Sequence, residues 1–285
     1  MFNPKAWPSV EYDLAEAAYH QLDLMSASRL KVLEFGTSMH LDHQIRNPRE
    51  DNEDMMIGRA LHTYCLRRAA FNSEFAVSPK FDGRTKDGKA AKEQFALENA
   101  GKCVLNEDQM AIVTGMAEGI MRHEDAYKFV AGLPGRPEVS VFCEIDGILA
   151  KSRFDRMVEI DGELCIVDIK STRSSAGRRE FERTIWSLGY ALQALFYSEM
   201  AFEAGLGRPQ HFVFVAVEKS APHVTACYRL REDALAAFEP RLDALIARYK
   251  DYLEHGPKGY EGIEEIAVPA WALRELETET GETNG

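Results

Sequence analysis

The sequence has little cysteine and no long apolar run, and both shortages exclude classes of protein. Its five cysteines, among 285 residues, are scattered and form no CxxC pair, so neither a zinc ribbon nor an iron–sulfur cluster has support. A reducing cytoplasm is the simplest setting for such a chain. No apolar run approaches the roughly 20 residues that a membrane-spanning helix needs. The first residues lack the basic-then-apolar order of a signal peptide, so we expect none.

Positive charge is also scarce, with 34 Lys and Arg against 46 Asp and Glu and a net charge of −12. This balance alone argues against a nucleic-acid partner, because nucleic acid favours basic surfaces. The basic residues are clustered, however. Residues 84–92 carry four basic side chains and one acid, and residues 173–183 carry four basic and two acidic ones. These runs are either a local basic lining or ordinary solvated charge.

The order of apolar residues predicts one α/β domain with a helical beginning. Hydrophobic residues make up 45% of the chain, as in a soluble globular protein. From Glu138 onward the apolar period changes to two, and alternating segments lie on both sides of two Asp-Gly pairs. The pattern predicts helices over 54–71, 107–130, 186–203 and 231–254, a loop over 78–89, and late strands over 211–219 and 223–230. Pro240 either disturbs the last helix or marks a boundary.

The two Asp-Gly pairs set the expected register of three strands, because Asp-Gly between alternating segments favours a two-residue hairpin loop. If Asp161-Gly162 is such a loop, Asp155 lies opposite Asp168. If Asp146-Gly147 is another, Glu138 lies opposite Asp155. The sequence therefore predicts three carboxylates in one row on one face. Opposed like charges destabilise a sheet, so the row predicts a compensating cation, for which Mg²⁺ or Mn²⁺ are the natural candidates.

Odd and even positions of a strand lie on opposite faces of the sheet, so the other residues of these strands can be assigned to one face or the other. Lys170 has the parity of Asp168 and is expected on the same face, and the opposite face is expected to pack on the core through Phe154, Val158, Cys165, Val167 and Ile169. A different outcome stays open. The acids could sit on a solvated face and pair with Lys151, Arg153 and Arg156, and a bulge in either strand would break the register.

These residues resemble a known nuclease signature. Asp155, followed after a hairpin by Asp168-Ile169-Lys170, resembles the PD-(D/E)XK motif. Gln193 to Tyr197 is similar to the QxxxY element of the RecB-like branch, and GRALH at 58–62 to that branch's helical histidine motif. The finer match is to RecE-type exonucleases (the exonuclease VIII C-terminal domain and its phage relatives). It runs from about residue 24 to 230 and includes SASRLK, RTKDGKAA and FVAVEK.

The resemblance implies a PD-(D/E)XK nuclease-like α/β core, in which a central mixed sheet with antiparallel hairpins is flanked by helices. It implies one nuclease domain over residues 1–285. The parts would be a helical N-terminal part at about 1–53, a nuclease core at about 54–254, and an acidic, loosely ordered tail at about 260–285.

The resemblance also implies roles for single residues. Asp155 and Asp168 would be metal ligands, with the Ile169 carbonyl and the His62 imidazole as further ones. Lys170 would orient or activate the attacking water, and Glu138 would be an accessory acid. Gln193 and Tyr197, four residues apart on one helix face, would bracket the site. The expected DNA contacts are Arg84, Lys86, Lys89 and Arg173.

Plainer interpretations of the same residues stay open. His62 could be a hydrogen-bonded helix histidine, Tyr197 a core aromatic, and the 84–92 segment a solvated loop rather than a phosphate grip.

The implied activity is that of a metal-dependent DNA exonuclease. It would hydrolyse linear duplex DNA from the 5′ end with Mg²⁺ or Mn²⁺, in phage-type or bacterial recombination. The implied assembly is a ring of identical subunits, with a single-strand annealing protein as a possible partner and no membrane. Three alternatives remain: a Cas4-like or AddB-like nuclease without the iron–sulfur cluster, a catalytically inactive DNA-binding or assembly protein on the same fold, and a structural α/β protein with an acidic surface.

Overall fold

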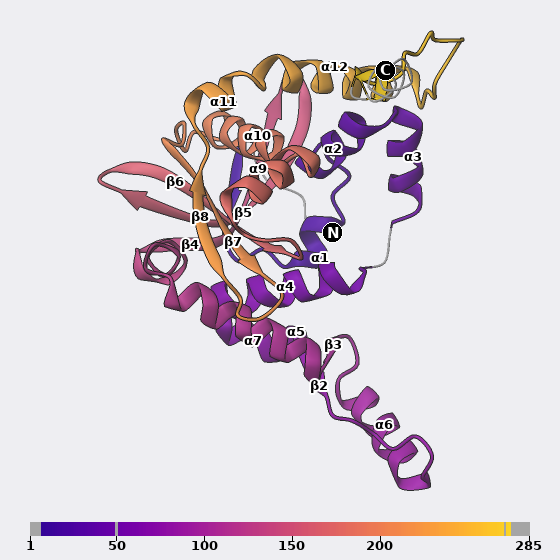
Figure 1. Cartoon of the computed structure of the whole chain (residues 1–285), viewed down its shortest axis with the longest axis vertical. Helices are drawn as coiled ribbons and strands as arrows, with labels where there is room; N and C mark the ends of the chain where they lie inside the picture. Colours follow the sequence, from indigo (N-terminus) through magenta and orange to yellow (C-terminus); the bar gives the residue numbers. More distant parts are fainter. Residues whose placement is uncertain (1–6, 49–50, 271, 275–285) are drawn as a thin grey trace, which may run out of the picture.

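One six-stranded sheet forms the centre of the protein (Figure 1). The computed structural model describes residues 7–48, 51–270 and 272–274. Only β6 and β7 pair in parallel, and the other neighbours in the sheet are antiparallel. In spatial order the strands are β1 (Ser9–Glu11), β4 (Gly135–Ile145), β5 (Ile148–Ile160), β6 (Glu163–Thr172), β7 (His211–Glu218) and β8 (Thr225–Arg229).

Helices cover both faces of this sheet, and each face has its own apolar core. One core joins the sheet to α2 (Ala27–Phe35), α3 (Ser38–Arg46), α9 (Arg178–Ser187), α10 (Tyr190–Glu203) and α12 (Glu239–His255). The other joins it to α4 (Glu53–Leu66), α5 (Phe71–Glu74), α7 (Glu107–Arg122) and α8 (Glu124–Tyr127). The mixed α/β fold predicted from the sequence is confirmed.

The helix boundaries follow local signals in the sequence. Asn52 caps α4 by accepting from the Met55 N–H, and Asn106 forms a capping box with Gln109 at the start of α7. Pro240 lies in the first turn of α12, where its missing N–H costs nothing, and it separates this helix from α11 (Glu232–Ala236). Of the two expectations for Pro240, a disturbed helix or a boundary, the structure therefore shows the boundary.

Other predicted helices are shorter than expected or divided. The predicted 186–203 helix is interrupted at Gly189, whose φ of 62° is left-handed, so that α9 ends and α10 begins there. The predicted 107–130 helix becomes α7, α8 and a π-helical turn over Lys128–Gly132. In the described part of the chain, no helix has the length and apolar character to cross a bilayer.

The hairpin register predicted from the two Asp-Gly turns is confirmed. Ile145 pairs with Ile148 and Ile160 with Glu163, so each loop has two residues. Both loop residues have positive φ, 51° and 82° in the first turn and 53° and 84° in the second, as a type I′ turn requires.

The strands separate at the level of the predicted carboxylate row. The β4–β5 ladder skips Glu138 and Asp155 and resumes in the same register at Pro137 and Arg156. The β5–β6 ladder ends at Arg156 and Val167, one level short of Asp155 and Asp168. Pro137 has no N–H to give the ladder, and Glu138 has a φ of 51°. A local distortion of both strands therefore lies where the acids stand.

This distortion changes the face on which β5 side chains lie, which corrects the parity prediction. Phe154 packs in the core with α10, whereas Val158 packs in the core with α4, although their parity is the same. Cys165, Val167 and Ile169 share the core of Val158, as expected. No residue is inserted at the gap, because the β4–β5 register is the same on both sides, so this distortion is not the bulge that the sequence interpretation left open. Phe154 was nevertheless placed on the wrong face.

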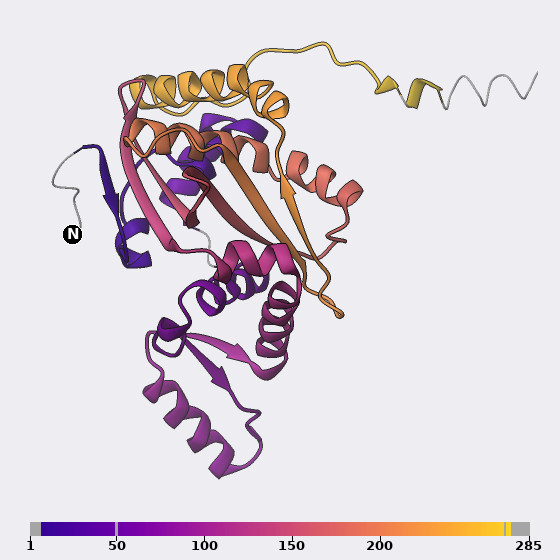
Figure 2. The same cartoon turned by 90° about the vertical axis from the view of Figure 1, so that its left-hand side faces the viewer.

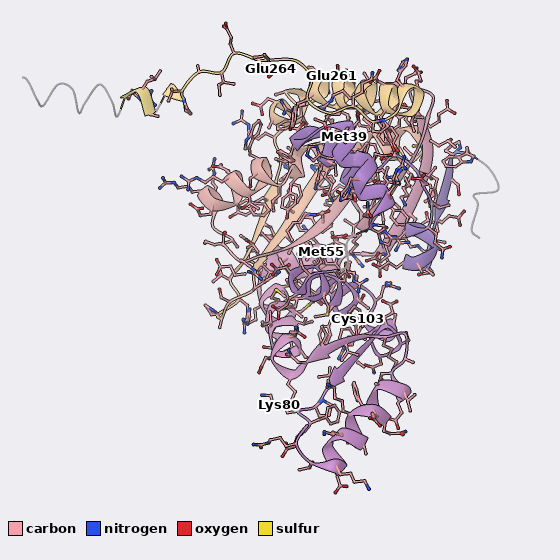
Figure 3. All side chains as sticks on the ribbon, turned by 90° about the vertical axis from the view of Figure 1, so that its right-hand side faces the viewer. Met39, Met55, Lys80, Cys103, Glu261 and Glu264 are labelled. Atoms are coloured by element: carbon pink, nitrogen blue, oxygen red, sulfur yellow. The ribbon has the colours of Figure 1, made fainter. Side chains whose placement is uncertain are left out.

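A small arm projects from the body (Figure 2). It consists of the parallel pair β2 (Phe75–Ser78) and β3 (Cys103–Asn106) and the helix α6 (Lys86–Glu98) between them. None of the residues of α6 is buried. Figure 3 places Lys80 along this arm and Cys103 nearer the body. The predicted 78–89 loop is wrong at its end, because Thr85 caps α6 by accepting from the Gly88 N–H.

The structure can be compared with the N-terminal part and the tail that the sequence predicts. Helices α1 (Glu16–His20), α2 and α3 lie in the part expected to be helical, together with the short strand β1. Of the predicted tail at 260–285, residues 261–270 are exposed, and residues 271 and 275–285 lie outside the described part.

Candidate active site

Asp155 stands in the gap where β5 and β6 separate. Its Oδ2 accepts the Ile169 backbone N–H at 2.7 Å, a donor that would otherwise pair with the neighbouring strand. Opening the ladder would leave this N–H without a partner, and the carboxylate supplies one. The distortion of the strands and the position of the acid are therefore parts of one arrangement.

His62 reaches the same gap from α4. Its Nε2 lies 3.0 Å from the Ile169 carbonyl oxygen and its Nδ1 lies 3.4 Å from Asp155 Oδ1. Burial alone would lower the pKa of His62, but the Asp155 carboxylate outweighs burial and raises this pKa to about 9. The structure thus brings His62, Asp155 and Ile169 together, as the sequence resemblance implied.

A second group of contacts surrounds Asp168 on the α10 side of β6. Gln193 donates from Nε2 to Asp168 Oδ1 at 2.8 Å, and Lys170 Nζ lies 2.6 Å from Oδ2. Lys170 is the partner of the buried Oδ2, as an ion pair. Burial raises the pKa of Asp168, while the Lys170 charge opposes that rise.

Two further side chains complete this group. The ammonium groups of Lys170 and Lys31 lie 4.6 and 5.0 Å from the centre of the Tyr190 ring. Lys31 also donates to Gln193 Oε1 at 2.8 Å. Burial, followed by the repulsion of Lys170, lowers the pKa of Lys31 to about 7. Sequence reasoning did not assign Lys31 a role, although it ends the SASRLK stretch that carried part of the resemblance.

Glu138 and Asp155 line a cavity of about 220 Å³ together with His62 and Tyr197. Burial, and then the negative charge of Asp155, raises the pKa of Glu138. Arg153 lies 3.8 Å from the Glu138 carboxylate. A larger hollow of about 820 Å³ lies at the far end of the hairpins, around Glu159 and Glu163, but it contains none of the residues of the strand gap. The chemistry of the lining, rather than its volume, therefore identifies the site.

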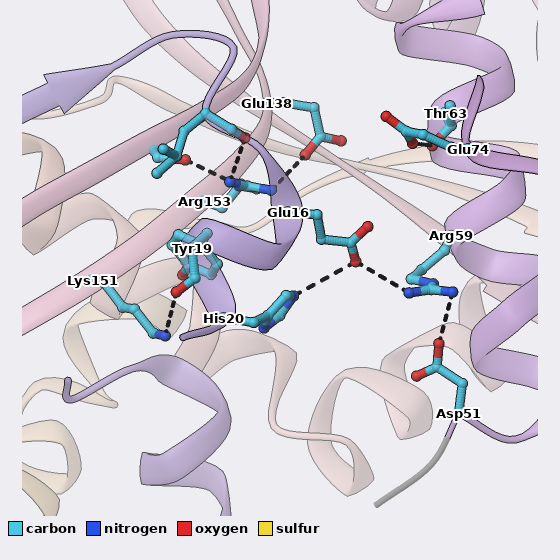
Figure 4. Close-up of polar contacts among 12 residues, drawn as sticks. Glu16, Tyr19, His20, Asp51, Arg59, Thr63, Glu74, Glu138, Lys151 and Arg153 are labelled. Atoms are coloured by element: carbon cyan, nitrogen blue, oxygen red, sulfur yellow. Dashed lines mark hydrogen bonds and ion pairs between the residues drawn. The ribbon is translucent and has the colours of Figure 1, made fainter. Parts of the chain in front are cut away.

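Arginines line the rim of the same cavity (Figure 4). Arg59 lies 3.5 Å from Glu16 on α1 and 3.0 Å from Asp51, and Arg67 lies 2.9 Å from Glu74 at the base of the arm. The hydrogen bond to His20 lowers the pKa of Glu16 to about 2, which burial opposes and Arg59 assists. The rim thus offers cationic groups beside the acidic gap.

Tyr197 has a packing role and also lines the cavity. Its ring lies 5.3 Å from that of Phe154, so it belongs to the core beneath the site. Burial raises its pKa well above the ordinary value. Gln193, four residues earlier on α10, contacts Asp168 directly. The expectation that both residues bracket the site fits these positions, although only Gln193 hydrogen-bonds to a carboxylate.

The four expected DNA-contact residues lie apart from this gap. Arg84, Lys86 and Lys89 are on the arm, and Arg84 pairs with its neighbour Asp82 at 3.1 Å. Arg173 pairs with Asp54 at the start of α4, and Lys219 pairs with the same carboxylate. The structure therefore divides these basic residues between the arm and the end of β6.

The single row of three acids predicted from the register is wrong in detail. Asp155 contacts His62 from α4, whereas Asp168 contacts Gln193 from α10. Over the described ranges, no three His, Cys, Asp or Glu side chains come close enough to hold a metal ion as they stand. The two carboxylates nevertheless act on one another, since the charge of Asp155 also raises the pKa of Asp168.

The donors at the gap fit a hard divalent cation in their chemistry. Asp168, Glu138 and Asp155 provide carboxylates, His62 provides an imidazole and Ile169 a backbone carbonyl. Carboxylate and carbonyl oxygens suit Mg²⁺ or Mn²⁺. Asp155, Asp168, Glu138, His62 and Ile169 are therefore the residues that would hold such an ion.

A known structure shares this fold. A chain described as “Putative exonuclease” from Eubacterium rectale has a TM-score of 0.63 at 14% identity, over 92% of this chain and 98% of that one. SSO0001 aligns at 14% identity over 79% and 86% of the two chains, with a TM-score of 0.32. VC1899 from Vibrio cholerae aligns at 12% identity over 87% and 59%, with a TM-score of 0.25.

Sequence comparison identifies the family. A search of curated proteins gave no match. A family model does match, over residues 26–264, a range that includes α4, Asp155 and the Asp168-Ile169-Lys170 stretch. Its description agrees with the strand gap, the Asp155 and Asp168-Ile169-Lys170 pattern and the fold of the exonuclease-like chain. The chain belongs to the family described as a PDDEXK-like domain of unknown function.

Proposed function

We propose that this protein is a metal-dependent DNA nuclease. The observation that carries the proposal is the meeting of Asp155, His62 and the Ile169 backbone at the strand gap, with Lys170 held beside it by Asp168 and Gln193. The family and the fold shared with the Eubacterium rectale chain support it. DNA is the substrate that such a fold implies.

The finer proposal is a RecE-type exonuclease. It would hydrolyse linear duplex DNA from the 5′ end and expose a 3′ strand for recombination, with Mg²⁺ or Mn²⁺. The stretches SASRLK, GRALH and RTKDGKAA support this branch by resemblance. A ring of identical subunits and a single-strand annealing partner belong to the same proposal.

The residues of the site have separate tasks in phosphodiester hydrolysis. A divalent ion, when bound, lowers the pKa of water and polarises the phosphoryl oxygens. Asp155, Asp168 and Glu138 would supply the negative charge that holds the ion, and His62 can serve only in its neutral form. Lys170 is fixed between Asp168 and Gln193, 2.6 and 3.4 Å away. Its ammonium can donate to a water oxygen and stabilise charge that develops on the phosphate.

The arm supports binding rather than chemistry. Residues 75–106 include six basic and four acidic side chains, although the whole chain carries a net charge of −12. The base of the arm meets the rim of the cavity through Glu74 and Arg67. A duplex with one end at the mouth of the cavity would therefore run past α6, where Lys86 and Lys89 are available to phosphates.

Digestion of end-labelled linear duplex DNA tests this function. We expect hydrolysis with Mg²⁺ or Mn²⁺, none with chelator, and faster loss of the 5′ label than of the 3′ label. A matched protein with Asp155→Asn separates this activity from a contaminating nuclease. DNA binding without hydrolysis under any divalent ion would instead support an inactive DNA-binding or assembly protein on the same fold.

A further inference from the structure

Lys31 lies in a slot beside Gly189, a residue without a side chain. It follows Leu30 on α2, whose side chain is in the core. The stem of Lys31 passes Gly189 at the start of α10, where an added Cβ would lie 3.3 Å from the Lys31 Cγ. Gly189 also has a φ of 62°, which favours glycine. The slot directs the ammonium group toward Gln193 on the first turn of α10.

Hydrogen-bond chemistry then determines how the Gln193 amide is oriented. In its charged form the Lys31 ammonium group only donates, so the oxygen of the amide faces Lys31, at 2.8 Å. The amide nitrogen consequently faces Asp168 and donates to Oδ1 at 2.8 Å. Lys31 and Asp168 therefore hold the two ends of one amide group.

The same amide oxygen joins Lys31 to the lysine of the signature. Lys170 Nζ lies 3.4 Å from Gln193 Oε1, a longer and weaker contact than that of Lys31. Both ammonium groups also face the Tyr190 ring. Without the Lys31 amine, Gln193 would keep only the long Lys170 contact on its oxygen, and its hydrogen bond to Asp168 would be held less firmly.

We propose that Lys31 is a positioning residue that acts on Asp168 through Gln193, and that it keeps the carboxylate in the orientation that the reaction uses. This inference rests on the proposed nuclease function for its kinetic consequence. Its structural part, the Lys31–Gln193–Asp168 chain of contacts, can be tested without any hydrolysis.

The first measurement is independent of activity. The side-chain amide signal of Gln193 is followed by nuclear magnetic resonance and assigned by its absence in Gln193→Leu. In metal-free protein, Lys31→Met should speed the exchange of these amide protons about tenfold, because a hydrogen bond that holds the amide closed is lost. Lys31→Arg should keep the exchange slow, and Lys250→Met, an exposed lysine on α12, is the control.

The second measurement is kinetic, on the full-length protein with Mn²⁺ and linear duplex DNA. Lys31→Met should lower kcat about tenfold with KM within about twofold, and Lys31→Arg should restore most of the rate. Because Lys31 acts through Gln193, the double variant Lys31→Met with Gln193→Leu should be no slower than Gln193→Leu alone.

The results that would overturn the inference differ from failure of the proposed function. Fully additive losses in the double variant, or a raised KM at unchanged kcat, would show that Lys31 acts on DNA by itself. Unchanged amide exchange in Lys31→Met would remove the structural part. If the wild-type protein hydrolyses no DNA, the nuclease proposal fails, and the amide exchange alone decides whether Lys31 orients Gln193.

Discussion

Asp155 accepts the backbone N–H of Ile169 at 2.7 Å, across the point where β5 and β6 stop pairing. One carboxylate oxygen thus replaces a strand-to-strand hydrogen bond, and the other lies 3.4 Å from His62. The residue expected to hold a metal ion also closes a gap in the sheet. Structural and chemical demands on Asp155 can therefore be separated by substitution.

Asp155→Asn and Asp155→Ala should differ in stability but not in activity. The asparagine oxygen can still accept the Ile169 N–H, whereas alanine leaves this part-buried donor unpaired at a cost of about 1–3 kcal/mol. Both substitutions remove the charge that a hard cation needs, so both should abolish hydrolysis. Urea unfolding in chelator and single-turnover cleavage with Mn²⁺ provide the two measurements. Equal stability of the two variants would mean that the Ile169 contact contributes nothing.

Lys170→Met should make the stability of the protein depend on metal. Asp168 would keep Gln193 as a donor but lose the cation that lies 2.6 Å from its Oδ2. Breaking a buried ion pair from one side costs about 3 kcal/mol, which should appear in chelator as a lower unfolding temperature. Mn²⁺ should recover most of this loss by supplying positive charge, while hydrolysis stays lower by about two orders of magnitude or more.

Lys250→Met, on the exposed face of α12, is the control for the loss of a lysine charge. Cleavage at the normal rate by Lys170→Met would show that Lys170 only balances the carboxylates. In that case the nuclease signature would lose the residue that distinguishes it from an acidic cluster.

Charge reversal on the arm should affect DNA binding without changing the chemistry. Arg84→Glu with Lys86→Glu should weaken affinity and reduce the slope of log K against log salt by about two, because two phosphate contacts are lost. Lys128→Glu with Lys250→Glu changes the net charge equally at two exposed positions of the body. Equal effects of the two double variants would assign the loss to overall charge rather than to the arm.

The hairpins could be predicted from the sequence because their information is local. Asp146-Gly147 and Asp161-Gly162 place two residues of positive φ side by side, which specifies a two-residue loop and hence the register. The change of face beyond Phe154 could not be predicted in the same way, since it arises where two ladders stop. Pro137 was the available signal, because proline inside a strand marks a break in pairing.

The site residues also differ in whether local sequence or a distant part of the chain determines their contacts. The short motifs located His62 and Asp155, which contact each other, and Gln193, which contacts Asp168. Lys31 was missed because a lysine on a helix is usually solvated, and its burial depends on Gly189 far along the chain. The start of α6 was missed because Gly88 suggested a loop, while the Thr85 cap favoured a helix.

The lowered pKa of Glu16 predicts how the stability of the folded protein depends on pH. Its pKa is lowered from 4.5 to about 2 in the folded protein, chiefly by the hydrogen bond to His20 and also by Arg59. A lowered pKa means that the folded state binds this proton less readily than the unfolded state. The stabilisation is therefore fully present above about pH 4.5 and is lost as the pH falls toward 2.

Glu16→Gln should consequently destabilise the protein at pH 7 by about 1 kcal/mol, less than the whole shift implies, because water screens this half-exposed carboxylate. The difference from wild type should shrink as the pH is lowered from about 4.5 and vanish near 2. Urea unfolding of both proteins across this range provides the measurement, with Glu118→Gln on the exposed face of α7 as the control. A difference that stays constant with pH would mean that Glu16 contributes through packing of α1 over the cavity and not through its charge on the Arg59 rim.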